Sequence, residues 1–382
     1  MYEFYEFFAG GGMARAGLGR EWRCVFANDI DQKKSDVYRE NWGPAELKTA
    51  DVGSLAANDL PGQADLAWAS FPCQDLSLAG PGAGLKGGRS GAFWPFWGLI
   101  KALVGENRAP KLIVLENVCG TLTSHGGKDF ATICDALAQG GYRFGAVVID
   151  AVLFVPQSRP RLFIIGVHRG VVVPDEILTE APIAPWHPRA VVEAHNGLSP
   201  RGKPQWLWWK LPQPRAGVAK FADLIDAEPS GVEWHTREQT NHILRLMSPT
   251  NRQKVQRARE VDGRVIGAVY RRTRKNKDGD SAQRAEVRFD DIAGCLRTPR
   301  GGSSRQTILV IEGRRVRSRL LSPREAARLM GLPESYRLPA NYNSAYHVVG
   351  DGVVAPVVRY VSRHILERLL ANEPAARAST AA

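Results

Sequence analysis

The chain has 382 residues, 44% of them hydrophobic and 24% charged, a balance typical of a globular protein long enough for two domains. Its five cysteines include no CxxC pair, which argues against a disulfide framework or a zinc site. No apolar run approaches the roughly 20 residues that cross a bilayer, and the acidic start lacks the basic residues of a secretory signal. We therefore expect a cytoplasmic protein without a membrane segment or a bound metal.

The positive charge is concentrated in one segment. The net charge is +12, and the segment from Arg252 to Arg319 holds 19 lysines and arginines against 8 acidic residues. A basic block of this kind is typical of a protein that binds a polyanion, most often nucleic acid. The alternative is a basic surface or a partly disordered loop around Arg271–Lys277.

Short apolar runs alternate with helical stretches over the first 170 residues. The pattern predicts strands at Tyr2–Phe8, Arg23–Asn28, Ala64–Ser70, Lys111–Glu116 and Arg161–Val167. It predicts helices at Met13–Arg20, after Asp31, at Ala92–Val104 and at Asp129–Gln139. Such alternation favours an α/β fold with a mostly parallel, doubly wound sheet.

The alternation ends after His168. Residues 171–343 are rich in proline and basic residues and predict a second, less regular domain, with a helix at Ser322–Met330 that opens on a capping box of Ser322 and Glu325. A last helix is expected at Val353–Leu370. We therefore predict a catalytic domain at 1–170 that is completed by about 344–371, a smaller domain at 171–343, and a flexible tail at 372–382.

A glycine turn follows the first strand and opens a helix. Gly10 and Gly12 allow a ligand to approach the backbone there, and Asp29 ends the next strand, where an acid can accept hydrogen bonds from ribose hydroxyls. Asp51 ends a third candidate strand. Because Arg15 stands where a dinucleotide fingerprint has glycine, a pyrophosphate cofactor is disfavoured and an adenosine cofactor without phosphates remains.

Three further groups of polar residues lie at the ends of predicted strands: two at the carboxyl edge of the sheet and one before the strand at Arg161–Val167. Cys73 comes directly after a strand and before a glycine-rich loop, which suits a nucleophile beneath a mobile lid; the alternative is an inert buried thiol. Glu116 ends the next buried strand, either as a functional carboxylate or as a helix cap. Arg159 and Arg161 project to the same side of an extended segment and could donate to a base or a phosphate, or form a surface pair.

The order of these motifs resembles that of the DNA (cytosine-5)-methyltransferase family over nearly the whole chain. The matching motifs are Phe8-Ala9-Gly10-x-Gly12, Asn28-Asp29, Asp51, Phe71-Pro72-Cys73-Gln74, Glu116-Asn117-Val118, Gln157-x-Arg159-x-Arg161 and Leu321-Ser322-Pro323-Arg324-Glu325. The resemblance implies a Rossmann-like, S-adenosylmethionine-dependent methyltransferase fold, with a smaller irregular domain that recognises the DNA target.

The resemblance also implies a role for each matching residue. Cys73 attacks carbon 6 of a cytosine flipped out of double-stranded DNA, Glu116 hydrogen-bonds the ring, and Arg161 with Arg159 supports the carbonyl oxygen and a nearby phosphate. The implied contacts to S-adenosylmethionine are Phe8, Ala9, Gly10, Gly12, Asn28, Asp29, Ile30, Asp51, Val52, Pro72, Asp351 and Val353. The expected DNA contacts are Gln74, Ser77, Arg89, Gln157, Arg271, Arg272, Arg274, Arg297, Arg300 and Arg305.

Four positions depart from the family's pattern. Gly350-Asp351-Gly352-Val353 stands where the family usually has Gly-Asn-Ser-Val, so Asp351 can add a negative charge near the pocket. Ile30 stands where an aromatic residue is common, and Met13 where glycine is frequent.

Other functions remain open at this point. One alternative is a transfer-RNA cytosine-5 methyltransferase, which shares the fold, and another is a catalytically silent DNA-binding protein. The long basic segment favours duplex DNA, and the retention of Cys73, Glu116 and both arginines favours an enzyme, whereas a nicotinamide-dependent dehydrogenase is disfavoured by Arg15. We expect a monomer associated with the nucleoid, with a cognate restriction endonuclease as a genetic rather than a physical partner.

Overall fold

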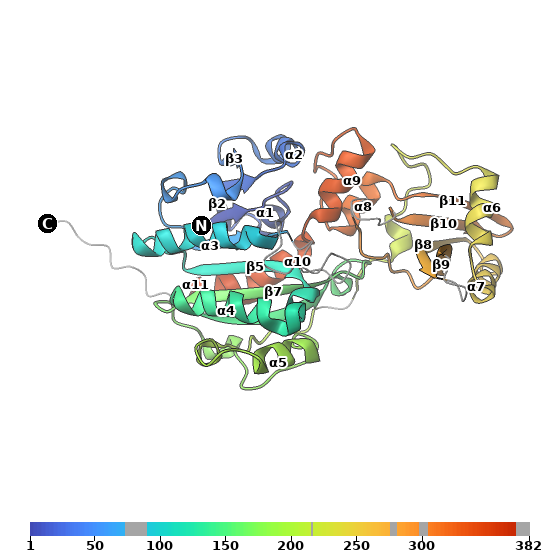
Figure 1. The fold of residues 1–382 in the computed structure, drawn as a ribbon. Coiled ribbons are helices and arrows are strands. Elements are labelled where there is room, and N and C mark those ends of the chain that lie inside the picture. The colour runs from blue at the N-terminus through green and yellow to red at the C-terminus, as the bar shows by residue number, and fades with distance from the viewer. Residues whose placement is uncertain (73–89, 215–216, 276–280, 298–304, 372–382) are drawn as a thin grey trace. The chain divides into compact units, whose positions relative to one another are not determined.

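The computed structural model describes residues 1–72, 90–214, 217–275, 281–297 and 305–371. The chain divides into two compact units (Figure 1). Unit 1 comprises Met1–Asp150, Pro160–Pro214 and Val353–Ala382, and unit 2 comprises Ala151–Arg159 and Arg215–Gly352. The sequence-based boundaries at 170/171 and 343/344 differ from this division in where they assign 151–159, 171–214 and 344–352.

Unit 1 is built on a seven-stranded sheet in the order β3-β2-β1-β4-β5-β7-β6. Neighbouring strands from β3 to β5 run parallel, whereas β7 runs antiparallel to both β5 and β6. The strands are β1 (Tyr2–Phe7), β2 (Trp22–Asp29), β3 (Leu47–Thr49), β4 (Leu66–Ala69), β5 (Leu112–Val118), β6 (Tyr142–Asp150) and β7 (Pro160–His168). The predicted mostly parallel sheet is confirmed. The candidate strand expected to end at Asp51 corresponds to β3, which ends at Thr49, and β6 was not predicted.

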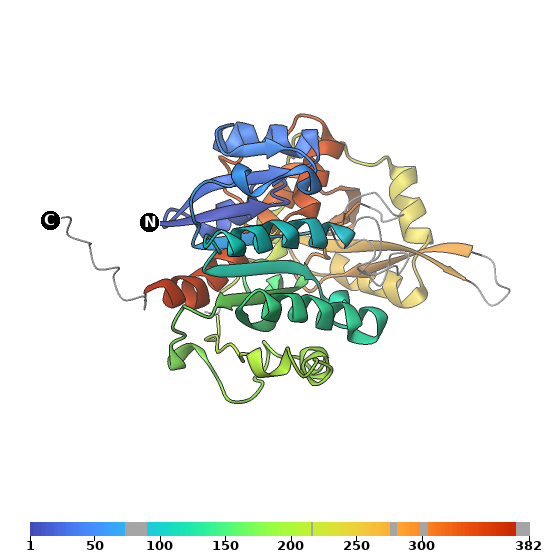
Figure 2. The same cartoon turned by 60° about the vertical axis from the view of Figure 1, so that its left-hand side comes forward.

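Helices cover both faces of this sheet. On one face, α3 and α4 bury Phe96 and Ile133 in one core with Phe7 of β1, and Figure 2 shows both helices in front of the sheet. On the other face α1 contacts α10, and the indole N–H of Trp22 donates to Ser362 in the π-helical turn after α10. The helices of unit 1 are α1 (Met13–Leu18), α2 (Gln32–Trp42), α3 (Phe93–Gly105), α4 (Lys128–Gln139), α5 (Arg189–Asn196), α10 (Ala355–Val361) and α11 (Glu367–Ala371).

A cluster of tryptophans extends the core of unit 1 beyond β7. Trp206 packs edge-on against Phe130 of α4 and Phe144 of β6, and Trp209 is fully buried. The strand–helix alternation therefore ends at His168, but burial against the sheet continues. This is why residues 171–214 lie in unit 1 although their sequence looks irregular.

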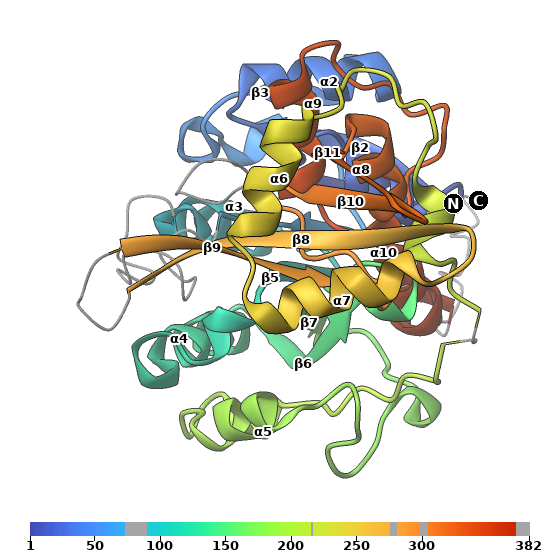
Figure 3. The ribbon, with the colours of Figure 1, turned by 90° about the vertical axis from the view of Figure 1, so that its right-hand side faces the viewer.

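Unit 2 contains a four-stranded antiparallel sheet in the order β11-β10-β8-β9. Its strands are β8 (Arg264–Lys275), β9 (Ser281–Arg288), β10 (Thr307–Glu312) and β11 (Arg315–Leu320), and its helices are α6 (Arg237–Arg245), α7 (Pro249–Arg259), α8 (Pro323–Leu329) and α9 (Tyr342–Asp351). Figure 3 shows α6 and α7 across one face of this sheet, where Ile243 and Val255 pack with Val269 and Leu309. The sequence-based prediction assigned none of these strands: β8, β9 and β11 contain several arginines, whereas β10 is an apolar run that was readable as a buried strand.

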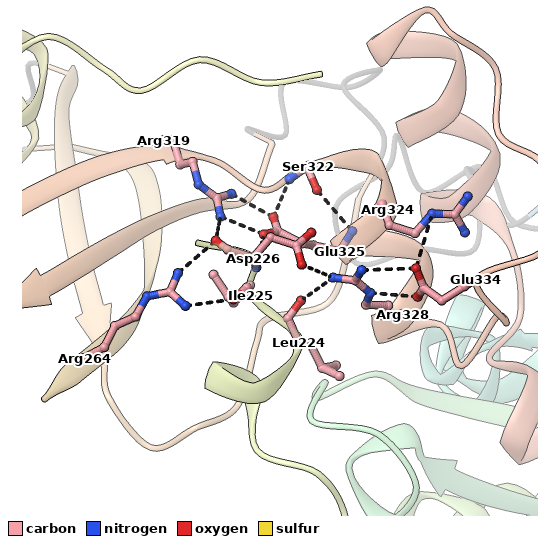
Figure 4. Close-up of polar contacts among 10 residues, drawn as sticks. All are labelled: Leu224, Ile225, Asp226, Arg264, Arg319, Ser322, Arg324, Glu325, Arg328 and Glu334. Atoms are coloured by element: carbon pink, nitrogen blue, oxygen red, sulfur yellow. Dashed lines mark hydrogen bonds and ion pairs between the residues drawn. The ribbon is translucent and has the colours of Figure 1, made fainter. Parts of the chain in front are cut away.

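A partly buried cluster of polar contacts joins the segment Leu224–Asp226 to the sheet of unit 2 and to α8 (Figure 4). The guanidinium groups of Arg264 and Arg319 donate to the backbone carbonyl of Asp226, and Arg328 contacts the Asp226 carboxylate at 2.8 Å. Ser322 caps α8 through reciprocal hydrogen bonds with Glu325, so the predicted capping box is confirmed. None of the described helices has the length and apolar character that a bilayer crossing requires.

Candidate active site

A tight glycine turn connects β1 to α1. Phe8, Gly10 and Gly12 all adopt left-handed backbone conformations, with φ of 56°, 56° and 77°. A Cβ at Gly12 would lie 2.3 Å from the indole nitrogen of Trp42, whose N–H donates to the carbonyl of Gly11 at 3.0 Å. Glycine at this position is therefore required both by the backbone and by the neighbouring indole.

Asp29 holds this turn against the end of β2. Its Oδ2 accepts the backbone N–H of Gly10 at 2.8 Å, and its Oδ1 accepts the N–H of Asp31 at 2.8 Å. Burial raises the pKa of the Asp29 carboxyl, and the nearby Lys34 and these backbone donors oppose that shift. The N–H of Ala9 also donates to the carbonyl of Asn28, so the ends of β1 and β2 form one rigid edge.

The residues around this edge fit an adenosine group. Among the described residues other than its chain neighbours, none has an atom within 4 Å of a Cβ placed at Gly10, which leaves the backbone open to a ligand. Ile30, directly after Asp29, is 67% exposed, an apolar side chain available to cover a purine ring. Asp51 is exposed and caps the turn that contains buried Val52, accepting the N–H of Gly53 at 2.7 Å.

Glu116 and Arg161 form an ion pair within unit 1. They extend from the antiparallel strands β5 and β7, and Arg161 Nε lies 3.3 Å from Glu116 Oε1. Both side chains are largely buried, so water screens their attraction only weakly. The arrangement places a carboxylate and a cationic donor side by side, a pairing able to hydrogen-bond a ring nitrogen and a carbonyl oxygen of the same base.

Asn117 connects this pair to the segment that leads into Cys73. Its side-chain amide donates to the carbonyl of Phe71 at 3.3 Å, and its Oδ1 accepts the N–H of Val118 at 2.8 Å. The sequence motif contains Asn117, but sequence reasoning gave it no role; its position between an acid and a strand end was the available signal. Four candidates of this segment lie outside the described residues: Cys73, Gln74, Ser77 and Arg89. Pro72 is described and exposed.

Gln157 and Arg159 lie in unit 2, where both side chains are buried. Gln157 Oε1 accepts the N–H of Leu296 at 3.1 Å, and its Nε2 donates to the carbonyl of Leu329 at 2.8 Å. Arg159 Nη1 donates to the carbonyl of Leu296 at 2.9 Å. The two side chains therefore hold both backbone groups of Leu296, immediately before Arg297.

Arg159 also holds the turn that contains the departure from the family's pattern. Its Nη2 donates to the carbonyls of Gly350 and Gly352 at 2.9 and 2.7 Å, on either side of Asp351. The Asp351 carboxylate lies 3.6 Å from His347 Nε2, one helical turn away. Val353, which follows Gly352, is buried in unit 1.

The candidate DNA contacts of unit 2 lie on different surfaces. Arg271 follows Val269 at a spacing of two and faces α6 and α7, whereas Arg272 projects from the opposite face of β8. Arg272 is exposed and stands directly opposite exposed Arg284 on β9. These two like charges repel each other, and a bound polyanion would reduce that repulsion.

The remaining candidates flank a segment that the structure does not describe. Arg297 is exposed, and the guanidinium of Arg305 lies over the ring of Tyr342 at 5.4 Å and contacts Asn343. Arg300 and the side chain of Arg274 lie outside what is described.

Comparison with known proteins identifies the family. The model of a family described as C-5 cytosine-specific DNA methylase matches residues 2–367. The chain belongs to this family. Type II methyltransferase M.BsuFI of Bacillus subtilis is 26% identical over 376 residues, which cover 97% of this chain and 74% of that protein. Type II methyltransferase M.HpaII of Haemophilus parainfluenzae is 25% identical, covering 96% and 90% of the two chains.

Solved structures agree on the fold. The chain matches the Dnmt2 methyltransferase of S. pombe with a TM-score of 0.58 and 17% identity, over 97% of this chain and 99% of that one. It matches a DNMT2 mutant of Spodoptera frugiperda with a TM-score of 0.61 and 15% identity, over 97% and 100%. The methylase family thus accounts for the resemblance in the sequence: this chain is an S-adenosylmethionine-dependent enzyme of DNA methylation.

Proposed function

We propose that this chain methylates carbon 5 of one cytosine within a short sequence of duplex DNA, with Cys73 as the nucleophile. The observation that carries the proposal is the hydrogen bond from Asn117 to the carbonyl of Phe71. It supports the proposal because it joins the strand that presents Glu116 to Phe71, two residues before Cys73 in the chain.

The proposed chemistry begins with the Cys73 thiolate. Carbon 5 of cytosine is a weak nucleophile, and addition of the thiolate to carbon 6 places electron density on carbon 5. Glu116 hydrogen-bonds the ring nitrogen and the exocyclic amine, and Arg161 supports both Glu116 and the carbonyl oxygen of the base. Once carbon 5 carries the methyl group, loss of its proton to water and release of the thiolate restore the aromatic ring. The cytosine must leave the base stack first, because carbon 6 is inaccessible inside a duplex.

S-adenosylmethionine supplies, when bound, an electrophilic methyl group on a sulfonium centre. The residues proposed to hold it are those of the glycine turn and the strand ends of unit 1 beside it, namely Phe8, Ala9, Gly10, Gly12, Asn28, Asp29, Ile30, Asp51, Val52 and Pro72. The family resemblance adds Asp351 and Val353 to this set. Asp29 fixes the turn through Gly10 and orients a carboxylate for the ribose, and exposed Ile30 covers the adenine. The contacts of Arg159 with Leu296, Gly350 and Gly352 support a positioning role for this arginine, because they hold the backbone at Leu296 and on both sides of Asp351.

Unit 2 is proposed to select the methylated sequence. Arg297, Arg300 and Arg305 are the candidates for reading guanines, Arg271, Arg272 and Arg274 for contacting phosphates, and Gln74, Ser77 and Arg89 for contacting the DNA around the flipped base. The buried contacts of Gln157 support the interpretation that it acts by holding Leu296 rather than by touching DNA directly. A monomer acting at the nucleoid is the proposed state, and the Type II relatives support a cognate restriction endonuclease as a genetic partner.

Methyl transfer from labelled S-adenosylmethionine to genomic DNA, followed by bisulfite sequencing, tests this proposal. The wild type should mark cytosine at one short sequence, and Cys73→Ala should abolish the label. Cys134→Ala, a cysteine buried in the core on α4, is the matched control and should retain it. Label in transfer RNA but not in DNA would favour the alternative substrate, and DNA binding without methylation of either would favour a silent binding protein.

A further inference from the structure

The helical face of unit 2 carries a dense positive charge that the recognition residues do not account for. Between Arg237 and Arg259, which span α6 and α7, there are six arginines and lysines and one acid, Glu238. α7 alone contains four cations and no acidic residue. Among the described residues, the ion pairs of unit 2 lie in other elements and involve none of these cations.

The charged side chains face outward because the apolar ones face the sheet. Ile243 of α6 and Val255 of α7 are buried in the core of unit 2, whereas Arg245, Lys254 and Arg257 are exposed. The outer face has no exposed large apolar side chain among the described residues of either helix. A protein partner usually needs such an apolar anchor, so the face suits a polyanion better than a protein.

A groove continues this surface at the edge of α6. Its cavity of about 410 Å³ is lined by His235, Glu238, Gln239, His242, Ile243, Arg245 and Arg271. The two arginines and two histidines outnumber the single carboxylate, so the groove offers several donors to a phosphate oxygen. Arg271 lines this groove while its neighbour Arg272 projects from the other face of the sheet, so these arginines serve two separate surfaces.

Two cations of this surface also bond backbone carbonyls. Lys254 Nζ donates to the carbonyl of Val287 at 3.4 Å and keeps further N–H donors, whereas Arg252 is set apart because it bonds two such carbonyls. Arg252 Nε donates to the carbonyl of Met247 at 3.1 Å and its Nη2 to the carbonyl of Arg245 at 3.2 Å, so it satisfies backbone carbonyls after the end of α6. Arg245, Lys254 and Arg257 are the exposed cations best suited to contact a ligand.

We propose that the helical face of unit 2, formed by α6, α7 and the groove beside Arg271, binds the sugar–phosphate backbone of duplex DNA outside the methylated sequence. This inference rests on the proposed function, because it takes duplex DNA as the substrate. Contacts of this kind carry no sequence information; they add affinity and help the enzyme move along DNA between target sites.

The salt dependence of DNA binding tests the proposal. The variant Arg245→Gln/Lys254→Gln/Arg257→Gln and the wild type are titrated with a labelled random-sequence duplex of about 40 base pairs between about 50 and 200 mM salt. Each lost phosphate contact should reduce the slope of log affinity against log salt by about 0.9, so the triple variant should lose up to about 2.7. The apparent KM for genomic DNA should rise, with the affinity for S-adenosylhomocysteine unchanged.

The matched control removes the same charge from unit 1. Arg20→Gln/Lys101→Gln/Arg169→Gln changes exposed cations elsewhere and should keep the wild-type slope. Equal slopes for the wild type and the α6–α7 variant, or equal losses in the two triple variants, would overturn the proposal, as would competition by transfer RNA but not by duplex DNA. If the wild type methylates DNA but its slope equals that of the α6–α7 variant, only the proposal for this surface is wrong. If the wild type methylates no DNA, the proposed function is wrong as well.

Discussion

Arg319 of β11 and Glu325 of α8 form a bidentate ion pair in which both side chains are fully buried (Figure 4). Their nitrogen–oxygen distances are 2.8 and 2.7 Å, and Glu325 also accepts the backbone N–H groups of Ser322 and Asp226. Burial opposes ionisation of Glu325, but the hydrogen bonds and charge of Arg319 outweigh it and hold the pKa of this carboxyl below its usual value. The pair thus joins the sheet of unit 2, the first turn of α8 and the backbone of Asp226.

Removing one partner should destabilise unit 2 strongly. Glu325→Ala leaves the Arg319 guanidinium buried without its carboxylate, and a loss of about 3–5 kcal/mol in the free energy of unfolding is expected. Glu334→Ala is the control, because Glu334 pairs with Arg328 at the surface and should contribute about 1 kcal/mol at most. Urea denaturation of the three proteins measures both values, and similar losses for the two variants would contradict the assignment.

The buried pair illustrates what a sequence predicts well and what it does not. Ser322 and Glu325 predict a capping box, because the two residues are close in the sequence and the geometry of the motif is local. The partnership of Glu325 with Arg319 depends on how a strand and a helix meet, and local pattern contains no such information. The same holds for Gln157, whose motif predicts a functional site, whereas its contact with Leu296 joins residues far apart in the chain.

The fold of unit 1 was predictable because its strands are buried on both faces and its helices are amphipathic, so both show in the order of apolar residues. Trp206 and Trp209 could not be assigned to this unit from sequence, since no alternation marks their connection to the sheet. At the active site, the strand-end positions of Asp29 and Glu116 were readable, but the hydrogen bond from Asp29 to Gly10 and the ion pair of Glu116 with Arg161 were not.

Gln157 should influence the choice of DNA sequence without touching the cofactor. Gln157→Ala removes the acceptor for the N–H of Leu296, which should loosen the segment that begins at Arg297. We expect methylation at the preferred sequence, relative to sequences with one changed base pair, to fall by about tenfold, or about 1.4 kcal/mol. The affinity for S-adenosylhomocysteine should stay at the wild-type value.

The control for this prediction is a second buried glutamine of unit 2. Gln306 Nε2 donates to the carbonyls of Val269 and Thr307 and does not contact Leu296. Gln306→Ala should therefore lower stability without lowering sequence discrimination. Equal loss of discrimination in both variants would show that Gln157 acts only through the stability of unit 2. Bisulfite sequencing of methylated genomic DNA gives the discrimination ratio.

Asp29 should be needed for cofactor binding. Asp29→Asn weakens the acceptor for the N–H of Gly10 and removes the negative charge proposed to face the ribose, so the Kd for S-adenosylhomocysteine should rise by at least about tenfold. Asp36→Asn, an exposed change on the neighbouring α2, should leave the Kd unchanged. Isothermal titration calorimetry measures both; an unchanged Kd for Asp29→Asn would exclude Asp29 from the cofactor site.

Glu6 should make the stability of unit 1 depend on pH. Its carboxyl is buried in β1, with Oε1 accepting the N–H of Arg15 at 3.3 Å. Burial raises its pKa to about 8; the backbone and charge of Arg15 oppose the shift, and the charge of Asp29 adds to it. Because the folded state holds this proton more tightly than the unfolded chain, the stabilisation is complete below the unfolded pKa of about 4.5 and is lost as the pH rises towards about 8.

Glu6→Gln keeps the shape of the protonated side chain and removes its titration. At pH 5 the variant should melt within about a degree of the wild type. At pH 8 the variant should melt at least about 3 °C higher than the wild type, because at this pH folding of the wild type requires either uptake of a proton by Glu6 or burial of its charged carboxylate. Glu40→Gln, an exposed change on α2, should follow the wild type at every pH. Differential scanning calorimetry from pH 5 to pH 8 makes the comparison. If the melting temperatures of Glu6→Gln and the wild type change in parallel with pH, then this buried carboxyl does not cause the loss of stability at alkaline pH.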